Sequence, residues 1–148
     1  MCNAAYIYSR VRFEEGAPER DRPLAGQSPY LVNAGFFYQY DDKGISASLL
    51  YNRIGKRIES VGVPMQDQNE DIPDIYEMPR NSLDLTFSKK IGKVVEIKAG
   101  IQDMLNSKIE YKQFVKLADE NGGKREREQL VRSYRPGVDI NVGVSLKF

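Results

Sequence analysis

The chain has 148 residues, of which 41% are hydrophobic and 29% are charged, so its composition is compatible with an ordinary globular domain. Its 22 basic and 21 acidic side chains leave a net charge of +1, which gives no overall field to attract nucleic acid, and no nucleic-acid partner is expected. It has no histidine, the commonest metal ligand and general base, and its one cysteine, Cys2, cannot form an intramolecular disulfide. We therefore expect neither an enzyme nor a cofactor.

Alternation of apolar and polar residues runs through most of the sequence, and helical periodicity is nearly absent. No apolar run reaches the roughly 18 residues of a transmembrane helix. A transmembrane barrel strand, however, needs only about 9–11 residues with alternating side chains. The pattern predicts an all-β, antiparallel up-and-down meander of about seven strands.

Three strands are predicted in the first part of the chain, at residues 4–13, 30–40 and 45–54. In the second of them one face carries Val32, Ala34, Phe36, Tyr38 and Tyr40. Residues 14–29 are expected to form a connection, because they hold three prolines, two glycines and dense charge. Residues 41–44, Asp-Asp-Lys-Gly, are expected to form a hairpin turn with its glycine late.

Residues 57–79 make the longest gap between predicted strands, and with three prolines they are expected to be irregular. Three further strands are predicted after this gap, at residues 82–90, 94–104 and 109–117. The last strand ends the chain, with Val138, Ile140, Val142, Val144, Leu146 and Phe148 on one face. Because this alternation keeps its phase to the final aromatic residue, the terminal strand is expected to be tied into a sheet.

Reversals of the chain are expected at residues 91–93 and 103–108. Residues 118–128 are expected to form a charged loop, and the mixed-sign run at 124–128, Lys-Arg-Glu-Arg-Glu, is read as its solvated part. Counted back from the end of the terminal strand, these reversals place 41–44, 91–93 and 118–128 on the side opposite to that end. The two longer connections would then lie on the same side as that end.

The polar faces of the predicted strands carry an unusual number of charges, namely Asp84, Glu96, Lys98, Asp139 and Lys147. Two architectures produce such two-faced strands. In a soluble β-sandwich or small barrel the apolar faces point inward, and a module of this kind would use residues 57–79 to bind a partner. In a transmembrane barrel the apolar faces meet lipid, the polar faces line the lumen and aromatic residues gird both interfaces. The predicted strand lengths of about 9–11 residues exceed the soluble mode of about 5–6, which favours the membrane.

Several segments, in this order, resemble parts of a known family. They are residues 22–35 (Arg-Pro-Leu-Ala-Gly-Gln-Ser-Pro-Tyr-Leu-Val-Asn-Ala-Gly), 48–57 (Ser-Leu-Leu-Tyr-Asn-Arg-Ile-Gly-Lys-Arg), 74–80 (Asp-Ile-Tyr-Glu-Met-Pro-Arg) with the Leu-Asp-Leu of 83–85, 100–106 (Gly-Ile-Gln-Asp-Met-Leu-Asn) and 135–137 (Arg-Pro-Gly). The chain resembles the C-terminal barrel half of TonB-dependent outer-membrane receptors, particularly those of Bacteroidetes. At residues 103–105, Asp-Met-Leu stands where the family usually has Asn-Leu-Phe.

The resemblance implies a place in a bacterial outer membrane, in a barrel of about 22 strands with a plugged lumen. If the terminal strand enters the periplasm, residues 41–44, 91–93 and 118–128 are expected to be extracellular and the two longer connections periplasmic. It implies energy-coupled uptake of a nutrient or siderophore-like ligand by the whole receptor. Outer-membrane lipid is then one partner, and the outer-membrane assembly machinery is another, which would recognise the terminal strand through Phe148, Leu146 and Val144. Seven strands cannot close a barrel of this class, so we expect a fragment: a truncated gene, a mis-called start at Met1 or an excised piece. The plug domain and TonB would act only through missing regions, and the piece alone is not expected to transport.

The charges on the polar faces are expected to form ladders along the lumen. Glu96 and Lys98 are expected to pair across strands with Asp84 or Lys147. A second acidic group, Asp67, Glu70, Asp71 and Asp74, invites a calcium reading, but it lacks the spaced ligand pattern with a central glycine. A solvated loop is expected there instead.

Overall fold

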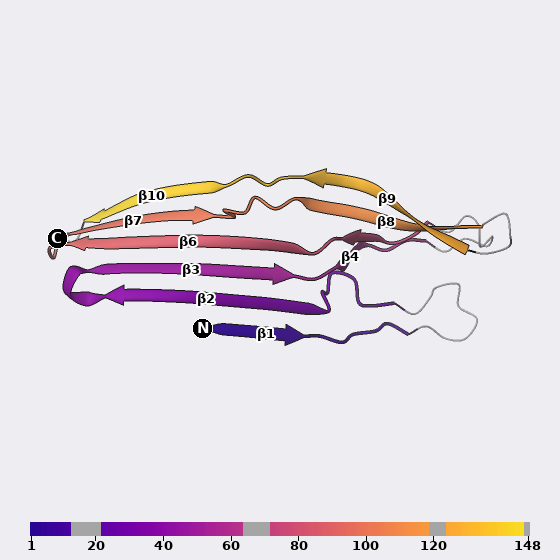
Figure 1. Ribbon diagram of the computed structural model, residues 1–148, viewed down its shortest axis with the longest axis horizontal. Coiled ribbons are helices and arrows are strands. Elements are labelled where there is room, and N and C mark those ends of the chain that lie inside the picture. Colours follow the sequence, from indigo (N-terminus) through magenta and orange to yellow (C-terminus); the bar gives the residue numbers. More distant parts are fainter. Residues whose placement is uncertain (13–21, 64–71, 119–123, 147–148) are drawn as a thin grey trace.

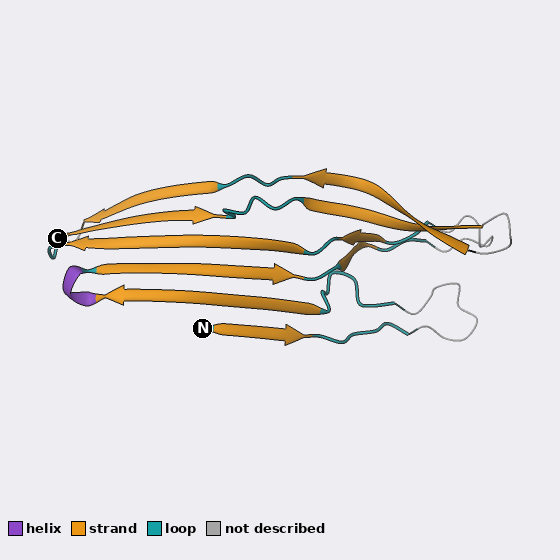
Figure 2. Ribbon diagram, viewed as in Figure 1, coloured by secondary structure: helices purple, strands orange, loops and turns teal. Residues whose placement is uncertain are grey.

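The computed structural model describes residues 1–12, 22–63, 72–118 and 124–146. Within these ranges the chain is built of antiparallel strands and one short 3-10 helix, which confirms the all-β prediction (Figure 2). The elements are β1 (Cys2–Tyr6), β2 (Tyr30–Tyr40), η1 (Asp41–Lys43), β3 (Ile45–Ile54), β4 (Arg57–Ser60), β5 (Ile75–Glu77), β6 (Arg80–Ile91), β7 (Val95–Gln102), β8 (Ile109–Ala118), β9 (Lys124–Tyr134) and β10 (Asp139–Leu146).

The strands form two sheets that lie end to end. Several passes of the chain, meaning runs from one end of the meander to the other, contribute a strand to each sheet. The first sheet has the order β1-β2-β3-β6-β7-β10 and the second has the order β4-β5-β8-β9. As Figure 1 shows, β4 continues β3, β6 continues β5, β8 continues β7 and β10 continues β9. Near the junction of the two sheets, hydrogen bonds from Met104 N to Leu83 O (2.8 Å) and from Met78 N to Glu110 O (2.9 Å) continue the pairing of β5 and β6 with β7 and β8. The result is a single-layered meander.

The tight turns lie at one end of the meander, together with the end of β10 (Figure 1). Gly44 closes the turn after β2 with a left-handed φ of 58°, and Gly92 closes the turn after β6 with a φ of 61°. The connections from β1 to β2, from β4 to β5 and from β8 to β9 leave from the opposite end.

The expected assignment of connections to the two sides is therefore wrong for 41–44 and 91–93. Both lie at the same end as the end of β10, whereas β1, β4 and β8, which lead into the long connections, run toward the other end. The cause is one miscounted reversal, because residues 103–108 do not turn the chain around. β7 and β8 run in one direction, along β6 and β5 respectively. Removing a single reversal changes the side of every connection that precedes it.

Three strand boundaries also differ from the prediction. β1 ends at Tyr6; beyond it, in the described residues, Ile7 N donates to Pro29 O at 2.9 Å and an isolated bridge joins Val11 to Arg22. The segment 57–79 is not wholly irregular, since it contains β4 and β5. The described part of the expected loop at 118–128 is strand, because β8 ends at Ala118 and β9 begins at Lys124. β9 was missed because arginine and glutamate alternate along its first residues, so hydrophobic periodicity gives no signal there.

Hydrophobic burial is almost absent from the described residues. Only Ile58, Ile109 and Tyr111 are buried hydrophobic residues there. In the ranges that the structure describes, each strand contacts its neighbours within a sheet, and no second sheet covers either face. The apolar side chains that a sandwich would enclose are therefore on the surface.

Candidate functional site

One face of the first sheet is apolar across its whole width. Residues that lie opposite each other on paired strands point to the same face, so the register gives rows of side chains. One row is Phe36, Leu49, Leu85, Ile101 and Ile140. The next row is Tyr38, Ala47, Phe87, Ala99 and Val142. A third row is Tyr40, Ile45, Lys89, Ile97 and Val144, in which Lys89 is the one charged residue. We call this surface the apolar face.

The apolar face is open. Phe36 is 67% exposed, Ile140 is 70% exposed and Val142 is 71% exposed. Contiguous apolar surface of this kind is rare on soluble monomers, where it marks a site that another apolar surface or a membrane covers.

Aromatic residues lie toward both ends of the apolar face. Tyr38 and Tyr40 lie toward the tight turns, and Tyr51 and Tyr30 lie toward the junction with the second sheet. The Tyr51 hydroxyl donates to Asn81 Oδ1 at 2.9 Å, so this ring combines an apolar body with a satisfied polar tip. Arg53 Nη1 donates to the same oxygen at 3.0 Å, which makes this edge polar.

The opposite face of the first sheet is polar. One row holds Gln39, Ser46, Ser88, Lys98 and Gly143, and the next holds Phe37, Ser48, Thr86, Gly100 and Asn141. Ser46 and Ser88 hydroxyls hydrogen-bond across strands at 2.7 Å, and Ser48 and Thr86 do so at 2.5 Å. Gly100 leaves room for Asn141, since a Cβ at Gly100 would lie 2.7 Å from Asn141 Oδ1. We call this surface the polar face.

Four predicted lumen charges, Asp84, Glu96, Lys98 and Asp139, share the polar face, while Lys147 lies outside the described residues. The expected pairing across strands is wrong for the groups that the structure describes. Lys98 Nζ lies 3.5 Å from Glu96 on its own strand. Asp84 Oδ1 instead accepts a hydrogen bond from Asp103 N at 2.8 Å. Register fixes which groups share a face, but the side-chain torsions decide which of them meet.

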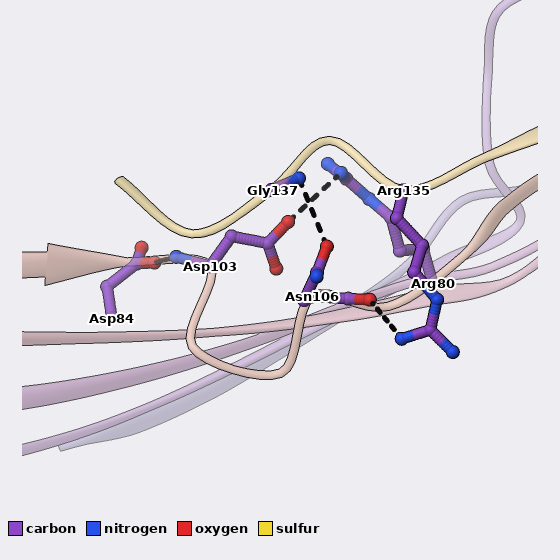
Figure 3. Close-up of polar contacts among 6 residues, drawn as sticks. All are labelled: Arg80, Asp84, Asp103, Asn106, Arg135 and Gly137. Carbon is purple, nitrogen blue, oxygen red and sulfur yellow. Dashed lines mark hydrogen bonds and ion pairs between the residues drawn. The ribbon is translucent and has the colours of Figure 1, made fainter. Parts of the chain in front are cut away.

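Residues 103–106 form a tight bend at the junction of the two sheets (Figure 3). Asp103 and Asn106 have positive φ values of 50° and 42°, which Asp and Asn tolerate better than most residues. Asn106 Oδ1 accepts from Gly137 N at 3.0 Å, and Asn106 O accepts from Arg135 Nη1 at 3.2 Å. Arg80 Nη1 lies 3.9 Å from Asp103 Oδ2. The bend joins the pass of β7 and β8 to the pass of β9 and β10.

The second sheet carries a cluster on the side that continues the polar face. The Lys56 ammonium lies over the rings of Tyr76 (4.0 Å) and Phe114 (3.8 Å). Burial among these rings lowers the pKa of Lys56, because it disfavours the charged form, and burial raises the pKa of Tyr76. A cleft of about 330 Å³ opens beside them, lined by Tyr6, Ile7, Tyr8, Ser9, Pro23, Gln27, Ser28, Pro29, Lys56, Arg57, Ile58 and Tyr76.

The structure describes two of the three residues that were predicted to form an assembly signal. Val144 and Leu146 lie on the apolar face of β10 and are 63% and 56% exposed, and Phe148 lies outside the described residues. β10 is an edge strand, paired with β7 alone within the residues that the structure describes. Its open edge is available to another strand.

The acidic residues that suggested calcium are mostly outside the described residues, as Asp67, Glu70 and Asp71 are. Asp74 Oδ1 accepts from Gly62 N at 2.8 Å. Over the part of the chain that is described, no group of three or more potential metal ligands converges. No described helix is long and apolar enough to cross a membrane.

Comparison of the chain with protein-family models, curated proteins and solved structures finds no match. The sequence predicted a solvated loop for Arg125 and Arg127, whereas the structure places both on β9. Their signal was the alternation of opposite charges at residues 124–128, which is as regular as an alternation of apolar and polar residues.

Proposed function

We propose that the chain forms part of the wall of a transmembrane β-barrel in a bacterial outer membrane, in a TonB-dependent receptor. The observation that carries this proposal is the open apolar face, which a single-layered sheet does not cover for itself. Leaving one Val, Leu, Ile or Phe side chain in water forgoes about 1.5–3 kcal/mol of burial. Lipid contact along the whole face recovers that free energy.

The height of the apolar face supports the proposal. From Val138, just before β10, to Leu146 alternate residues are apolar, which gives about 27 Å along the strand at about 3.4 Å per residue and about 21 Å of height at a tilt of about 40°. Outer-membrane barrels have an apolar band about 25 Å tall, crossed by strands tilted about 35–45°. The tyrosines at both ends of the face match the aromatic girdles of such a band.

The proposed orientation follows from the two ends of the meander. The tight turns and the end of β10 lie on the periplasmic side, and the long connections lie outside. β4, β5, β8 and β9 then extend beyond the membrane, and the polar face lines the lumen. Uptake of a nutrient or siderophore-like ligand belongs to the complete barrel, in which further strands pair with the open edges of β1 and β10. The chain alone does not transport.

The lack of tryptophan in the chain allows a direct test. Ile140→Trp puts a fluorescent ring on the apolar face, and Asn141→Trp puts one on the polar face of the same strand. In bilayers whose acyl chains carry bromine, the Ile140→Trp variant is expected to be quenched more strongly than the Asn141→Trp variant. Equal quenching, or a cooperative unfolding transition of the chain in plain buffer, contradicts the proposal.

A soluble binding module is the second candidate, and the cleft beside Lys56 favours it. The cleft combines tyrosine and proline surfaces with two cations, Lys56 and Arg57, and draws three of its lining residues from segment 57–79. Such lining suits an aromatic ligand that carries a negative charge. The bromine experiment separates the candidates, since a water-soluble module leaves both tryptophans unquenched.

A further inference from the structure

We propose that the apolar face, at the end where the tight turns lie, binds an anionic glycerophospholipid whose phosphate meets the ammonium groups of Lys43, Lys89 and Lys93. The headgroup of this lipid has one phosphate diester and no amine that compensates its charge, and the acyl chains lie along the apolar face. This inference rests on the proposed membrane location, and it adds the class of lipid that surrounds this end of the chain.

Lys89 is a cation on the apolar face itself, close to the tight turns. It lies opposite Ile45 on one neighbouring strand and opposite Ile97 on the other. A half-buried lysine between two isoleucines keeps its hydrocarbon stem on apolar surface and carries its ammonium group to the nearest polar layer. That layer lies at the tight turns, because Ile91 and Val95 are the last pair before the turn after β6.

The turn after β6 combines cations with exposed apolar side chains. Residues 89–94, Lys-Lys-Ile-Gly-Lys-Val, hold three lysines and no carboxylate. Ile91 and Val94 are exposed, and so is Lys93 between them. Apolar side chains next to ammonium groups suit the boundary between acyl chains and an anionic headgroup layer, where each kind of group meets its own environment.

Lys43 adds a cation from the neighbouring turn. Its Nζ lies 5.7 Å from the centroid of the Tyr40 ring, and Tyr40 shares a row of the apolar face with Ile45 and Lys89. Neighbouring strands lie about 4.8 Å apart, so Tyr40 and Lys89 are about 10 Å apart across Ile45. Two long, cationic side chains thus flank one apolar residue, and both can reach a headgroup that lies over it.

The carboxylates at this end lie mainly on the other side of the sheet. Asp41 Oδ1 accepts a hydrogen bond from Gln39 Nε2 at 2.7 Å, and Gln39 belongs to the polar face. Glu96 pairs with Lys98 on the polar face. Asp42 is exposed in the first turn and offsets only part of the positive charge. Within the described residues, none of the three lysines of the proposed site forms an ion pair.

This arrangement favours a headgroup with a single phosphate and a net negative charge. Lysine binds phosphate as a compact point charge and needs no fixed bidentate geometry. Tyr40 and Lys89 belong to one row, so the two ammonium groups beside them meet one plane of phosphates. A zwitterionic headgroup carries its own ammonium group, which competes with the lysines for the phosphate.

The test uses the full chain with Ile91→Trp, in vesicles that mix phosphatidylcholine and phosphatidylglycerol in equal amounts. Only one of the two lipids carries bromine, near the carbonyl end of its acyl chains, so quenching measures which lipid lies beside the turn after β6. About fivefold per lysine near an anionic surface predicts an association constant about fivefold to 25-fold higher for phosphatidylglycerol, with one or two lysines per headgroup. Adding Lys43→Gln/Lys89→Gln/Lys93→Gln is expected to remove this preference. About 1 M salt is expected to weaken it without any substitution, because the Debye length falls to about 3 Å.

Two controls accompany the test. Lys98→Gln/Lys108→Gln/Lys124→Gln removes three lysines from the polar face, the junction and the start of β9, and it is expected to keep the preference of Ile91→Trp. Ile140→Trp, on the apolar face toward the junction, is expected to be quenched equally by the two lipids. Equal quenching of Ile91→Trp by both lipids overturns the inference alone, as does the same preference at Ile140→Trp or an equal loss in the lysine control. If neither brominated lipid quenches Ile140→Trp, the proposed membrane function fails, and the inference with it.

Discussion

Asn106 links two passes of the sheet through its side chain and its backbone at once. Its Oδ1 accepts from Gly137 N and its carbonyl oxygen accepts from Arg135, while its own φ is 42°. Asparagine suits this position because it tolerates the left-handed region and has a short polar side chain. One residue therefore provides both the bend and the cross-link.

Replacing Asn106 by alanine is expected to lower the free energy of unfolding by about 1–2 kcal/mol, since a hydrogen bond is lost and a Cβ-bearing residue remains at positive φ. Urea unfolding of the chain in detergent micelles measures the change. Asn106→Gly relieves the backbone but not the hydrogen bond, so it should cost less than alanine. A glycine variant that is less stable than the alanine variant would contradict this account.

Gly44 and Gly92 allow two tight turns to be compared, because each glycine closes its turn with a positive φ. A Cβ at Gly44 would lie 2.8 Å from Lys90 Cβ and 3.1 Å from Lys90 O, whereas a Cβ at Gly92 meets nothing within 4 Å. Gly92→Ala is expected to cost about 1–2 kcal/mol from the backbone alone. Gly44→Ala is expected to cost about 1–3 kcal/mol more, because the contact adds to the backbone term.

The two turns are compared through the unfolding free energies of the single variants in detergent micelles. Equal losses at the two positions would show that the contact with Lys90 relaxes without cost. A larger loss at Gly92 would rule out the explanation by positive φ and contact together.

Elements differ in how far the sequence predicts them. β2 and β3 occupy the predicted residues. Apolar and polar residues alternate without interruption on both sides of a glycine turn, so only one pairing register puts the apolar residues of both strands on one face. Residues 103–108 show why other parts of the predicted strand arrangement were wrong. Asp and Asn at positive φ produce the same local signal in a bend that reverses the chain and in one that does not, and only the pairing partners distinguish them.

The residues of the candidate site were also predicted only in part. Alternation identified the polar-face charges Asp84, Glu96, Lys98 and Asp139, since parity alone fixes the face of a residue. It did not predict that Lys98 meets Glu96, because long side chains choose among several rotamers. Nor did it place Arg125 and Arg127 on a strand, since apolar periodicity gives no signal where charges of opposite sign alternate.

In the whole molecule, the described parts of the chain form a sheet with two exposed surfaces and almost no buried interior. A soluble protein of this size has a core that holds its layers together. Here the polar face binds itself through cross-strand hydrogen bonds, and the apolar face has nothing in the described chain to pack against. The stability of the sheet must therefore depend on what surrounds it. One substitution on each face can test this dependence.

Val142 and Gly143 are neighbours on β10 and lie on opposite faces of the sheet. Val142→Arg is expected to destabilise the chain in a bilayer by about 2–4 kcal/mol, the cost of a cation on the lipid face near the midplane. Gly143→Arg points into the polar face, where nothing lies within 4 Å of the new Cβ, and it is expected to be nearly neutral. If water covered both faces, each substitution would be an ordinary surface change within about 0.5 kcal/mol. Unfolding in lipid vesicles measures the difference, and a Val142→Arg variant as stable as Gly143→Arg would mean that the apolar face does not meet lipid.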